Sequence, residues 1–407
     1  MSSNSKQPNL EEPLRLGVIG LGRGFMLTLP TFNADDRIQL VAACAPRECS
    51  RTAFEQEFGG RTYQHVEDIC ADPDVEAVYI ATPHQMHVDH VEIAAKAGKH
   101  VLVEKPLAIH FEDGVKMVEV CEKAGVQLIV GPSHSFDGAV MLAHQIIQSG
   151  DIGAVRMIHA MNYTDFLYRP RRPEELVTAE GGGVIFSQAV HQLDIVRLLG
   201  GGMMNTITAA TGNWDPARPT EGAYSALATF EGGAFASLTY SGYAHFDSDV
   251  WQGWVGELGY PKDPENYGQA RKALAKVSNP EEESALKSGR TYGETPARPP
   301  APNHEHFGPI IVSCDGGDLR ITPNGVWLHG HFEQKYIPAP LEMGPRAGVN
   351  SALIKAVRFN APPSQTGRWG LATLEACHAI LQSAEAAAPV KLLHQIQTQK
   401  TNIGGNS

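Results

Sequence analysis

The sequence predicts an α/β protein of two domains: a doubly wound parallel sheet, followed by an α+β domain with an open, mostly antiparallel sheet. Three observations lead to this prediction. Short apolar runs alternate with helix-like segments over residues 14–132, and a glycine-rich turn follows the first run. Beyond residue 132, several runs alternate between polar and apolar residues, which is typical of antiparallel strands with one solvated face.

The first domain is expected at residues 1–132. Helical segments such as 87–99 and 111–125 separate its apolar runs and end on glycine or lysine, which favour helix termination. Strand and helix in alternation build a parallel sheet of the Rossmann type, whose ligands lie at the carboxyl ends of the strands. The expected strands are residues 14–20, 38–45, 76–83, 100–106 and 126–132.

The second domain is expected at residues 133–407. Alternating runs predict its open sheet, and two helical patterns close it. Residues 257–303 differ from the rest because they are charged, rich in proline and poor in large apolar residues. They predict a polar excursion with one helix, too polar to hold a core.

Composition excludes several functions. With 33 Lys and Arg against 45 Asp and Glu, the formal net charge is −12, so neither nucleic acid nor an anionic membrane is an expected partner. No run of eighteen apolar residues occurs and the start is polar, which predicts a cytoplasmic protein. The six scattered cysteines are typical of free thiols, and neighbours in the triplet His304, Glu305 and His306 point apart, so no metal site is expected.

The turn after the first strand resembles a dinucleotide fingerprint. Gly20 and Gly22 occupy its first two glycine positions, which permit a tight turn and the approach of a pyrophosphate to a helix N-terminus. Phe25 stands at the third position, with Gly24 one residue early and Arg23 beside it. Its place between a strand and a helix favours dinucleotide binding over a plain glycine turn.

The ends of the next strands indicate the nucleotide. NAD-binding domains often place a carboxylate after the second strand, but Ala45 stands there, followed by Arg47 and Arg51. This pattern favours the 2′-phosphate of NADP over NAD, unless Arg47 stacks on the adenine or lies in solvent. Further cofactor-binding candidates follow the later strands: Thr82, Pro83, His84, His87 and Glu104.

Lys105 is a candidate catalytic residue. It follows the buried strand of 100–106 in the motif Glu-Lys-Pro, where it faces the cofactor crevice. Burial and a positive nicotinamide would lower its pKa and suit it to proton transfer. The alternative is a lysine that ends a strand at the surface.

The stretch GGGVIFSQAVHQLD, residues 181–194, predicts a helix entered from a glycine loop. In an α-helix, Ser187 and His191 would lie one turn apart on one face, with Gln188 beside them. By itself the stretch is more typical of a capped helix whose histidine packs in a core.

These stretches together resemble the Gfo/Idh/MocA family, over residues 14–245 and again in the final helices. The resemblance implies hydride transfer between nicotinamide and a carbinol, with Lys105 and His191 as catalytic residues. It also implies a homodimer or homotetramer formed through the second sheet. The family's sugar dehydrogenases have an aspartate where this chain has Ser187, which disfavours a sugar or cyclitol.

Arg169, Arg171 and Arg172 precede the glycine loop. They form either a carboxylate clamp or a solvated patch. With the residues around them, they are similar to one branch of the family, the phthalate 4,5-cis-dihydrodiol dehydrogenases and their carboxylated relatives. This similarity implies oxidation of a small anionic diol, a carboxylated aromatic cis-dihydrodiol, to a catechol with NADP or NAD; His134 and Tyr163 are further candidates for the substrate pocket.

Three alternatives stay open from the sequence. The first is an NAD(P)-dependent sugar or cyclitol dehydrogenase, as in most of the family that the chain resembles. The second is the reduction of a tetrapyrrole or an imine on the same fold. The third is a non-catalytic regulator that senses the nucleotide, against which the presence of both Lys105 and His191 argues.

Overall fold

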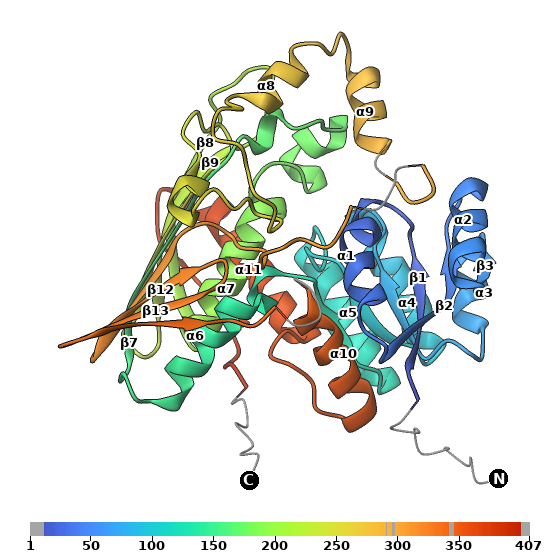
Figure 1. Cartoon of the computed structure of the whole chain (residues 1–407), viewed down its shortest axis with the longest axis horizontal. Coiled ribbons are helices and arrows are strands. Elements are labelled where there is room, and N and C mark those ends of the chain that lie inside the picture. Colours follow the sequence, from blue (N-terminus) through green and yellow to red (C-terminus); the bar gives the residue numbers. More distant parts are fainter. Residues whose placement is uncertain (1–11, 290, 295–297, 342–345, 400–407) are drawn as a thin grey trace.

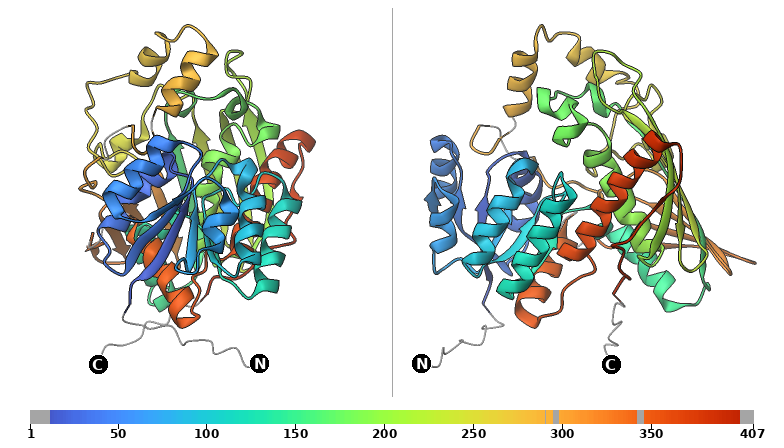
Figure 2. Two further views of the ribbon diagram at one scale, coloured as in Figure 1. Left: turned by 90° about the vertical axis from the view of Figure 1, so that its right-hand side faces the viewer. Right: turned by 180° about the vertical axis from the view of Figure 1, so that it is seen from behind.

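A computed structural model of the chain describes residues 12–289, 291–294, 298–341 and 346–399. Two layered units lie next to each other, each built on its own sheet (Figure 1). Figure 2 shows the helix α11 (Gly367–Ala386) running between them. Within the described ranges, no helix is long and apolar enough to cross a membrane.

The first sheet has six parallel strands in the order β3-β2-β1-β4-β5-β6, which is the Rossmann order and confirms the predicted doubly wound sheet. One strand was missed by the sequence analysis: β3 has three residues, all exposed or half-buried, and thus no apolar run to reveal it. The strands are β1 (Leu14–Ile19), β2 (Ile38–Cys44), β3 (Arg61–Tyr63), β4 (Ala77–Ile80), β5 (His100–Val103) and β6 (Leu128–Val130).

Helices cover both faces of this sheet (Figure 1). Near the end of the chain, α10 (Ala347–Phe359) returns to the first sheet's layer, where Arg358 pairs with Glu76 at 2.6 Å and Asn350 donates to Asp35 at 3.2 Å. The helices within the first domain's own sequence are α1 (Arg23–Asn33), α2 (Glu48–Phe58), α3 (Val66–Ala71), α4 (His87–Lys96) and α5 (Phe111–Ala124).

The second sheet has nine strands in the order β14-β13-β12-β11-β7-β10-β9-β8-β15. Only the β7 and β10 pair is parallel, so the predicted open and mostly antiparallel sheet is confirmed. The strands are β7 (Val155–Tyr163), β8 (Met204–Gly212), β9 (Ala223–Phe230), β10 (Phe235–Ser241), β11 (Ile310–Cys314), β12 (Gly317–Thr322), β13 (Gly325–Gly330), β14 (Gln334–Pro338) and β15 (Val390–Lys391).

The α-helices of this domain's core pack against one face of the second sheet (Figure 1). Alternation along β7 places Ile158 and Ala160 in the core beneath those helices, whereas Met157 faces outward and is 39% exposed. The covering helices are α6 (Gly138–Ser149), α7 (Val190–Leu199) and α11. The short 3₁₀ segments of the chain are η1 (His84–Met86), η2 (His134–Phe136), η3 (Phe166–Tyr168), η4 (Pro173–Leu176), η5 (Thr178–Glu180) and η7 (Ser248–Gln252).

The polar excursion holds two helices where the sequence predicted one. These are α8 (Gln269–Leu274) and α9 (Pro280–Ser288), and neither contains a buried residue. The start of α9 is well specified, because the Asn279 side chain accepts from the backbone N–H of Glu282 and a proline opens the helix. After α9, Tyr292 returns to the first domain and packs edge-on against Phe25, with 5.3 Å between ring centroids.

Asp194 joins the two domains. Its buried carboxylate accepts from the Ser133 hydroxyl at 2.6 Å and from the Trp369 indole N–H. Ser133 follows β6 of the first sheet, Asp194 lies on α7 and Trp369 on α11. This carboxylate therefore fixes α7 relative to the end of the Rossmann sheet.

We expect Asp194→Ala to lower the free energy of unfolding by roughly 2 to 5 kcal/mol, because it leaves two buried donors without an acceptor. Urea unfolding followed by circular dichroism would measure this change. Asp151→Ala is the control, since Asp151 is an exposed carboxylate at the end of a surface turn. Equal midpoints for the two variants would contradict a joining role for Asp194.

Candidate active site

Lys105 projects from the end of β5 to the second domain. Its Nζ donates to the backbone oxygen of Ser187 at 3.2 Å. Burial lowers the pKa of Lys105 to about 8; nearby Glu104 opposes this shift, while the charges of Arg346 and Arg23 add to it. A partly neutral amine at this position can accept a proton near neutral pH.

The segment before His191 is not a simple α-helix. Residues Ile185–Ala189 form a π-helical turn, and α-helical geometry begins at Val190. The four-residue stacking expected of Ser187 and His191 is therefore altered, because a π-turn adds a residue to the helical repeat. The Ser187 hydroxyl donates to the backbone oxygen of Gly183. The backbone oxygen of Ser187 accepts the hydrogen bond from Lys105 Nζ.

His191 is 8% exposed and packs edge-on against His134, with 4.6 Å between ring centroids. In the described part of the chain, its buried Nδ1 has no hydrogen-bond partner. Burial lowers the pKa of His191 well below its ordinary value, and the charges of Lys105, His134 and Arg346 lower it further. His191 is thus a neutral imidazole at neutral pH, suited to orient a hydroxyl group.

The glycine turn fits a dinucleotide. Gly20 has φ +98°, and a Cβ there would lie 2.9 Å from the Ala81 carbonyl carbon. Gly22 is the N-cap of α1, and a Cβ there would meet nothing within 4 Å, which leaves the helix N-terminus open to a pyrophosphate. Gly24 lies against Glu104, in the position where close packing of helix and strand is needed. A bound nicotinamide nucleotide would supply the hydride acceptor.

Arg23 is the first residue of α1, beside the position of the pyrophosphate. Phe25 is fully buried, so only its backbone can face a cofactor. At the end of β2, Ala45 is 4% exposed, and the Arg51 guanidinium donates to its carbonyl oxygen at 2.7 Å. Arg47 is exposed, and no hydrogen bond or ion pair with any described residue engages its guanidinium.

The candidates after β4 divide into two kinds. His87 is completely buried, with Nε2 3.1 Å from the Thr82 oxygen and Nδ1 3.1 Å from the Pro106 oxygen. It therefore positions the loop after Lys105 and has no surface for a cofactor. Pro83 is exposed, and His84 is half-buried and packs edge-on against His87 at 5.5 Å.

The three predicted arginines have different environments. Arg169 donates to Asp165 and to Glu257, each at 3.0 Å, so its charge is already balanced. Arg172 is paired with acidic neighbours in its own turn. Arg171 is 7% exposed, donates through Nη2 to the Phe166 oxygen at 2.7 Å, and has a buried Nε with no partner in the described residues. Arg172 Nε is also buried without a hydrogen-bond partner in the described residues, but its side chain is 39% exposed, so Arg171 is the more buried candidate for binding an anion.

Two other substrate-pocket candidates lie apart from each other. Gln188 is in the site, where its amide donates to the Ser187 oxygen at 3.0 Å and its oxygen accepts from the Tyr240 hydroxyl at 3.1 Å. Tyr163 is not brought together with it, because alternation along β7 turns its ring away from the inner face. That ring packs against the exposed Phe246 instead, at 6.1 Å.

Sequence reasoning missed charged residues that complete the site. Glu257, at the start of the excursion, pairs with Arg169; burial alone would raise the pKa of Glu257, but that pairing holds it below its ordinary value. Lys287, on α9, lies 3.0 Å from Glu175, and burial with the charge of Arg171 lowers the pKa of Lys287 to about 7. No local pattern marks either residue, because each meets its partner only in the folded chain.

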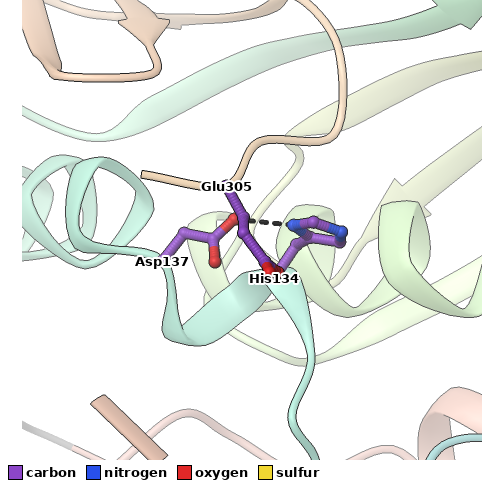
Figure 3. Close-up of side chains that lie close together, drawn as sticks. All are labelled: His134, Asp137 and Glu305. Carbon is purple, nitrogen blue, oxygen red and sulfur yellow. Dashed lines mark hydrogen bonds and ion pairs between the residues drawn. The ribbon is translucent and has the colours of Figure 1, made fainter. Parts of the chain in front are cut away.

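His134 belongs to a buried acidic cluster with Asp137 and Glu305 (Figure 3). His134 Nδ1 is 2.7 Å from the Asp137 carboxylate, and ligand-type atoms of the three residues all lie within 4.8 Å of one another. Arg346 is 3.0 Å from Glu305 and places a positive charge beside this cluster. His304, next to Glu305, turns away and bonds to the Ala339 oxygen.

Comparison with known proteins identifies the family. The profile of an oxidoreductase family with an NAD-binding Rossmann fold matches residues 14–132, and that of the GFO/IDH/MocA C-terminal domain matches residues 140–259. The chain belongs to the Gfo/Idh/MocA family. It is therefore an oxidoreductase, and its first domain is an NAD-binding domain.

One curated relative matches almost the whole chain. It is the 1-carboxy-3-chloro-3,4-dihydroxycyclohexa-1,5-diene dehydrogenase of Comamonas testosteroni, 46% identical over 379 residues, which span 91% of this chain and 95% of that protein. A crystal structure of a dehydrogenase from Bordetella bronchiseptica RB50 is also similar, with 39% identity, a TM-score of 0.89 and coverage of 93% and 100% of the two chains. The WlbA dehydrogenase of Bordetella pertussis, in complex with NADH and UDP-GlcNAcA, shares the fold at 22% identity, a TM-score of 0.68 and coverage of 95% and 99%.

If Lys105 accepts the hydroxyl proton, kcat/KM should rise with pH through about 8, because only the neutral amine is a base and its pKa is lowered to about 8. Lys105→Met should lower turnover by about a hundredfold or more, and the rise of kcat/KM through pH 8 should disappear in this variant. Initial rates of NADH or NADPH formation would measure both effects, and retained nucleotide binding would show an intact fold. A variant with near-normal turnover would contradict the role.

Proposed function

We propose that this oxidoreductase converts a carboxylated cyclohexadiene cis-diol to the corresponding catechol. The substrate class is supported by the relative from Comamonas testosteroni, whose name describes a carboxylated dihydroxycyclohexadiene. In the molecule, the proposal is carried by a cationic cluster whose Arg172 and Lys287 act, like Lys105, on the ring of His84.

The cluster is formed by Arg171, Arg172 and Lys287 around one carboxylate. Arg171 Nη1 lies 3.9 Å and Lys287 Nζ 3.0 Å from the same oxygen of Glu175, and Arg172 Nε lies 3.8 Å from its other oxygen. The charge of Arg23, in the glycine turn, also acts on both Arg171 and Lys287. Glu175 and Glu174, which lies 3.6 Å from Arg172, offset only two of these three positive charges, so we expect the cluster to stabilise a substrate carboxylate.

The reaction then follows from the positions of the side chains. Lys105 accepts the proton of one hydroxyl group, and a bound nicotinamide nucleotide would take the hydride from the same carbon. His191, neutral and buried, holds that hydroxyl by a hydrogen bond. Gln188 is placed to bind the second hydroxyl of the diol.

We further propose a substrate of the phthalate 4,5-cis-dihydrodiol type, with two ring carboxylates. The cluster offers both Arg171 and Lys287, and thus a donor for each of two anionic groups. The Comamonas relative's name contains a single carboxyl group, so the number of carboxylates is the finer point to test. Initial rates on cis-diols with no, one and two carboxylates would decide it.

NADP is the proposed cofactor of choice. An acidic residue at position 45 would repel the 2′-phosphate, and this chain has an alanine there, with the exposed Arg47 two residues on. Arg51 already lies over the turn, with 2.7 Å from its Nη1 to the Ala45 oxygen, and adds positive charge.

We also propose that the enzyme forms a homodimer or homotetramer through the second sheet. We propose in addition that it is cytoplasmic and binds neither nucleic acid nor membranes. Strand register places one row of outward side chains across β9, β10, β7 and β11 on the uncovered face. Leu227 and Ile311 in this row are 49% and 41% exposed, and Phe235 in the adjacent row is 42% exposed. A face of this composition is typical of a subunit interface.

We expect Arg171→Met to reduce kcat/KM by roughly thirty- to thousandfold on a carboxylated cis-diol, about 2 to 4 kcal/mol, because a partly buried ion pair is lost. The effect should be absent on the carboxyl-free benzene cis-dihydrodiol. Lys287→Met should show the same selectivity. Arg156→Met is the control, since Arg156 pairs with Asp315 at the sheet surface. Wild-type enzyme that uses both diols equally well would contradict the proposed substrate class.

Ala45→Asp should move the preference from NADP to NAD, because the new carboxylate repels a 2′-phosphate and can bind the ribose hydroxyls. The ratio of the kcat/KM values for the two nucleotides measures the preference. Arg47→Met should weaken NADP while leaving NAD unchanged. Wild-type enzyme that clearly prefers NAD would show that Arg47 does not bind the phosphate.

A further inference from the structure

His134 and Asp137 form a buried pair that is costly to the local fold. Asp137 is the N-cap residue of α6, yet its side chain makes no capping bond to that helix. It turns instead to His134, 2.7 Å away, so α6 lacks the stabilising side-chain cap that an aspartate at this position usually supplies. The two residues are 8% and 3% exposed. An aspartate that orients one ring nitrogen leaves the other nitrogen free for chemistry.

The imidazole ring of His134 lies against the ring of His191. No hydrogen bond with a described residue engages its Nε2, and its ring lies against His191 at 4.6 Å and Phe307 at 5.2 Å. His134 follows β6 and Lys105 follows β5, and these strands are neighbours in the parallel sheet. Both residues therefore belong to the same edge of the sheet, and the charges of both act on His191.

The charges around His134 favour a strong base. Asp137, Glu305 and Glu257 all act on it; burial alone would lower the pKa of His134, but these carboxylates raise it above its ordinary value. His191 faces it as a neutral ring, while Arg346 is engaged with Glu305. The two imidazoles thus differ: His191 is a weak base, and His134 is a stronger base than an ordinary histidine.

Oxidation of a cyclohexadiene cis-diol leaves a second proton to be moved. Loss of hydride and of the hydroxyl proton gives a hydroxycyclohexadienone, which becomes a catechol only when the neighbouring carbinol carbon loses its own proton. Resting on the proposed function, we propose that His134, held by Asp137, is the base that removes this carbon-bound proton. The enzyme then catalyses an aromatising tautomerisation in addition to the oxidation.

The step balances as follows. The carbon-bound proton passes to His134 Nε2, and its bonding electrons form the last ring double bond. The carbonyl electrons move to oxygen, which takes the proton that Lys105 accepted from the hydroxyl group. The overall change is diol and oxidised nucleotide to catechol, reduced nucleotide and one proton, which His134 then releases.

Proton exchange tests this base without any redox step. The probe is 3-hydroxy-4-oxocyclohexane-1-carboxylate, which cannot aromatise, incubated in D₂O with the full-length enzyme and ADP-ribose. Wild-type enzyme should replace the proton on the hydroxyl-bearing carbon by deuterium, as seen in its NMR signal. His134→Gln should slow this exchange by about a hundredfold, the scale of a lost general base. Asp137→Asn should slow it and move its pH profile to lower pH, since the carboxylate that raises the pKa of His134 is gone.

The control is His144→Gln. His144 is a buried histidine on α6, outside the site, so this variant should exchange the probe's proton at the wild-type rate. Absence of exchange with wild-type enzyme, or equal exchange by wild type and His134→Gln, would overturn the inference. Oxidation of the diol, followed at 340 nm, is a separate readout. Enzyme that oxidises no carboxylated diol refutes the proposed function, whereas enzyme that oxidises the diol without exchanging the probe refutes only the role of His134.

Discussion

The burial of one ammonium group, that of Lys105, is the constraint on which the site depends. Its charge is removed from water at the junction of two domains, with a backbone oxygen of the second domain 3.2 Å away. Burial of this kind is tolerated because it lowers the pKa of Lys105 to about 8, so that losing the proton is easy. The same desolvation that is unfavourable for stability therefore makes the residue a base.

A buried network connects this base to the opposite side of the site. Arg346 joins Glu305 of the second domain to the Thr28 hydroxyl of α1, at 3.0 and 2.9 Å. Thr28 in turn lies 3.2 Å from the Tyr79 hydroxyl, which donates to Glu104 at 2.6 Å. Each charge in this network has a partner, as buried charges require. The groups around Lys105 and those around His134 are thus held by one set of contacts, across both domains.

The sequence predicted the parts of this arrangement that are local. Alternating strands and helices depend on nearby residues, so the Rossmann sheet was predicted apart from the three-residue β3. Lys105 and His191 lie in continuous motifs and were found with them. Pairings between distant parts of the chain were not predictable. Nothing in the sequence around Arg169 indicates that it pairs with Glu257, 88 residues away. Nor does anything around Thr28 indicate its contact with an arginine 318 residues away.

The position of Ser187 now has an electrostatic explanation. The site gathers positive charge from Lys105, Arg171 and Lys287 within a chain of net charge −12. Glu175 pairs with Arg171 and Lys287, and a further anion would offset the remaining charge. A carboxylate at position 187 would supply that anion permanently and would repel a carboxylated substrate. With a serine there, the carboxylate of the proposed substrate would offset the positive charge that Glu175 leaves.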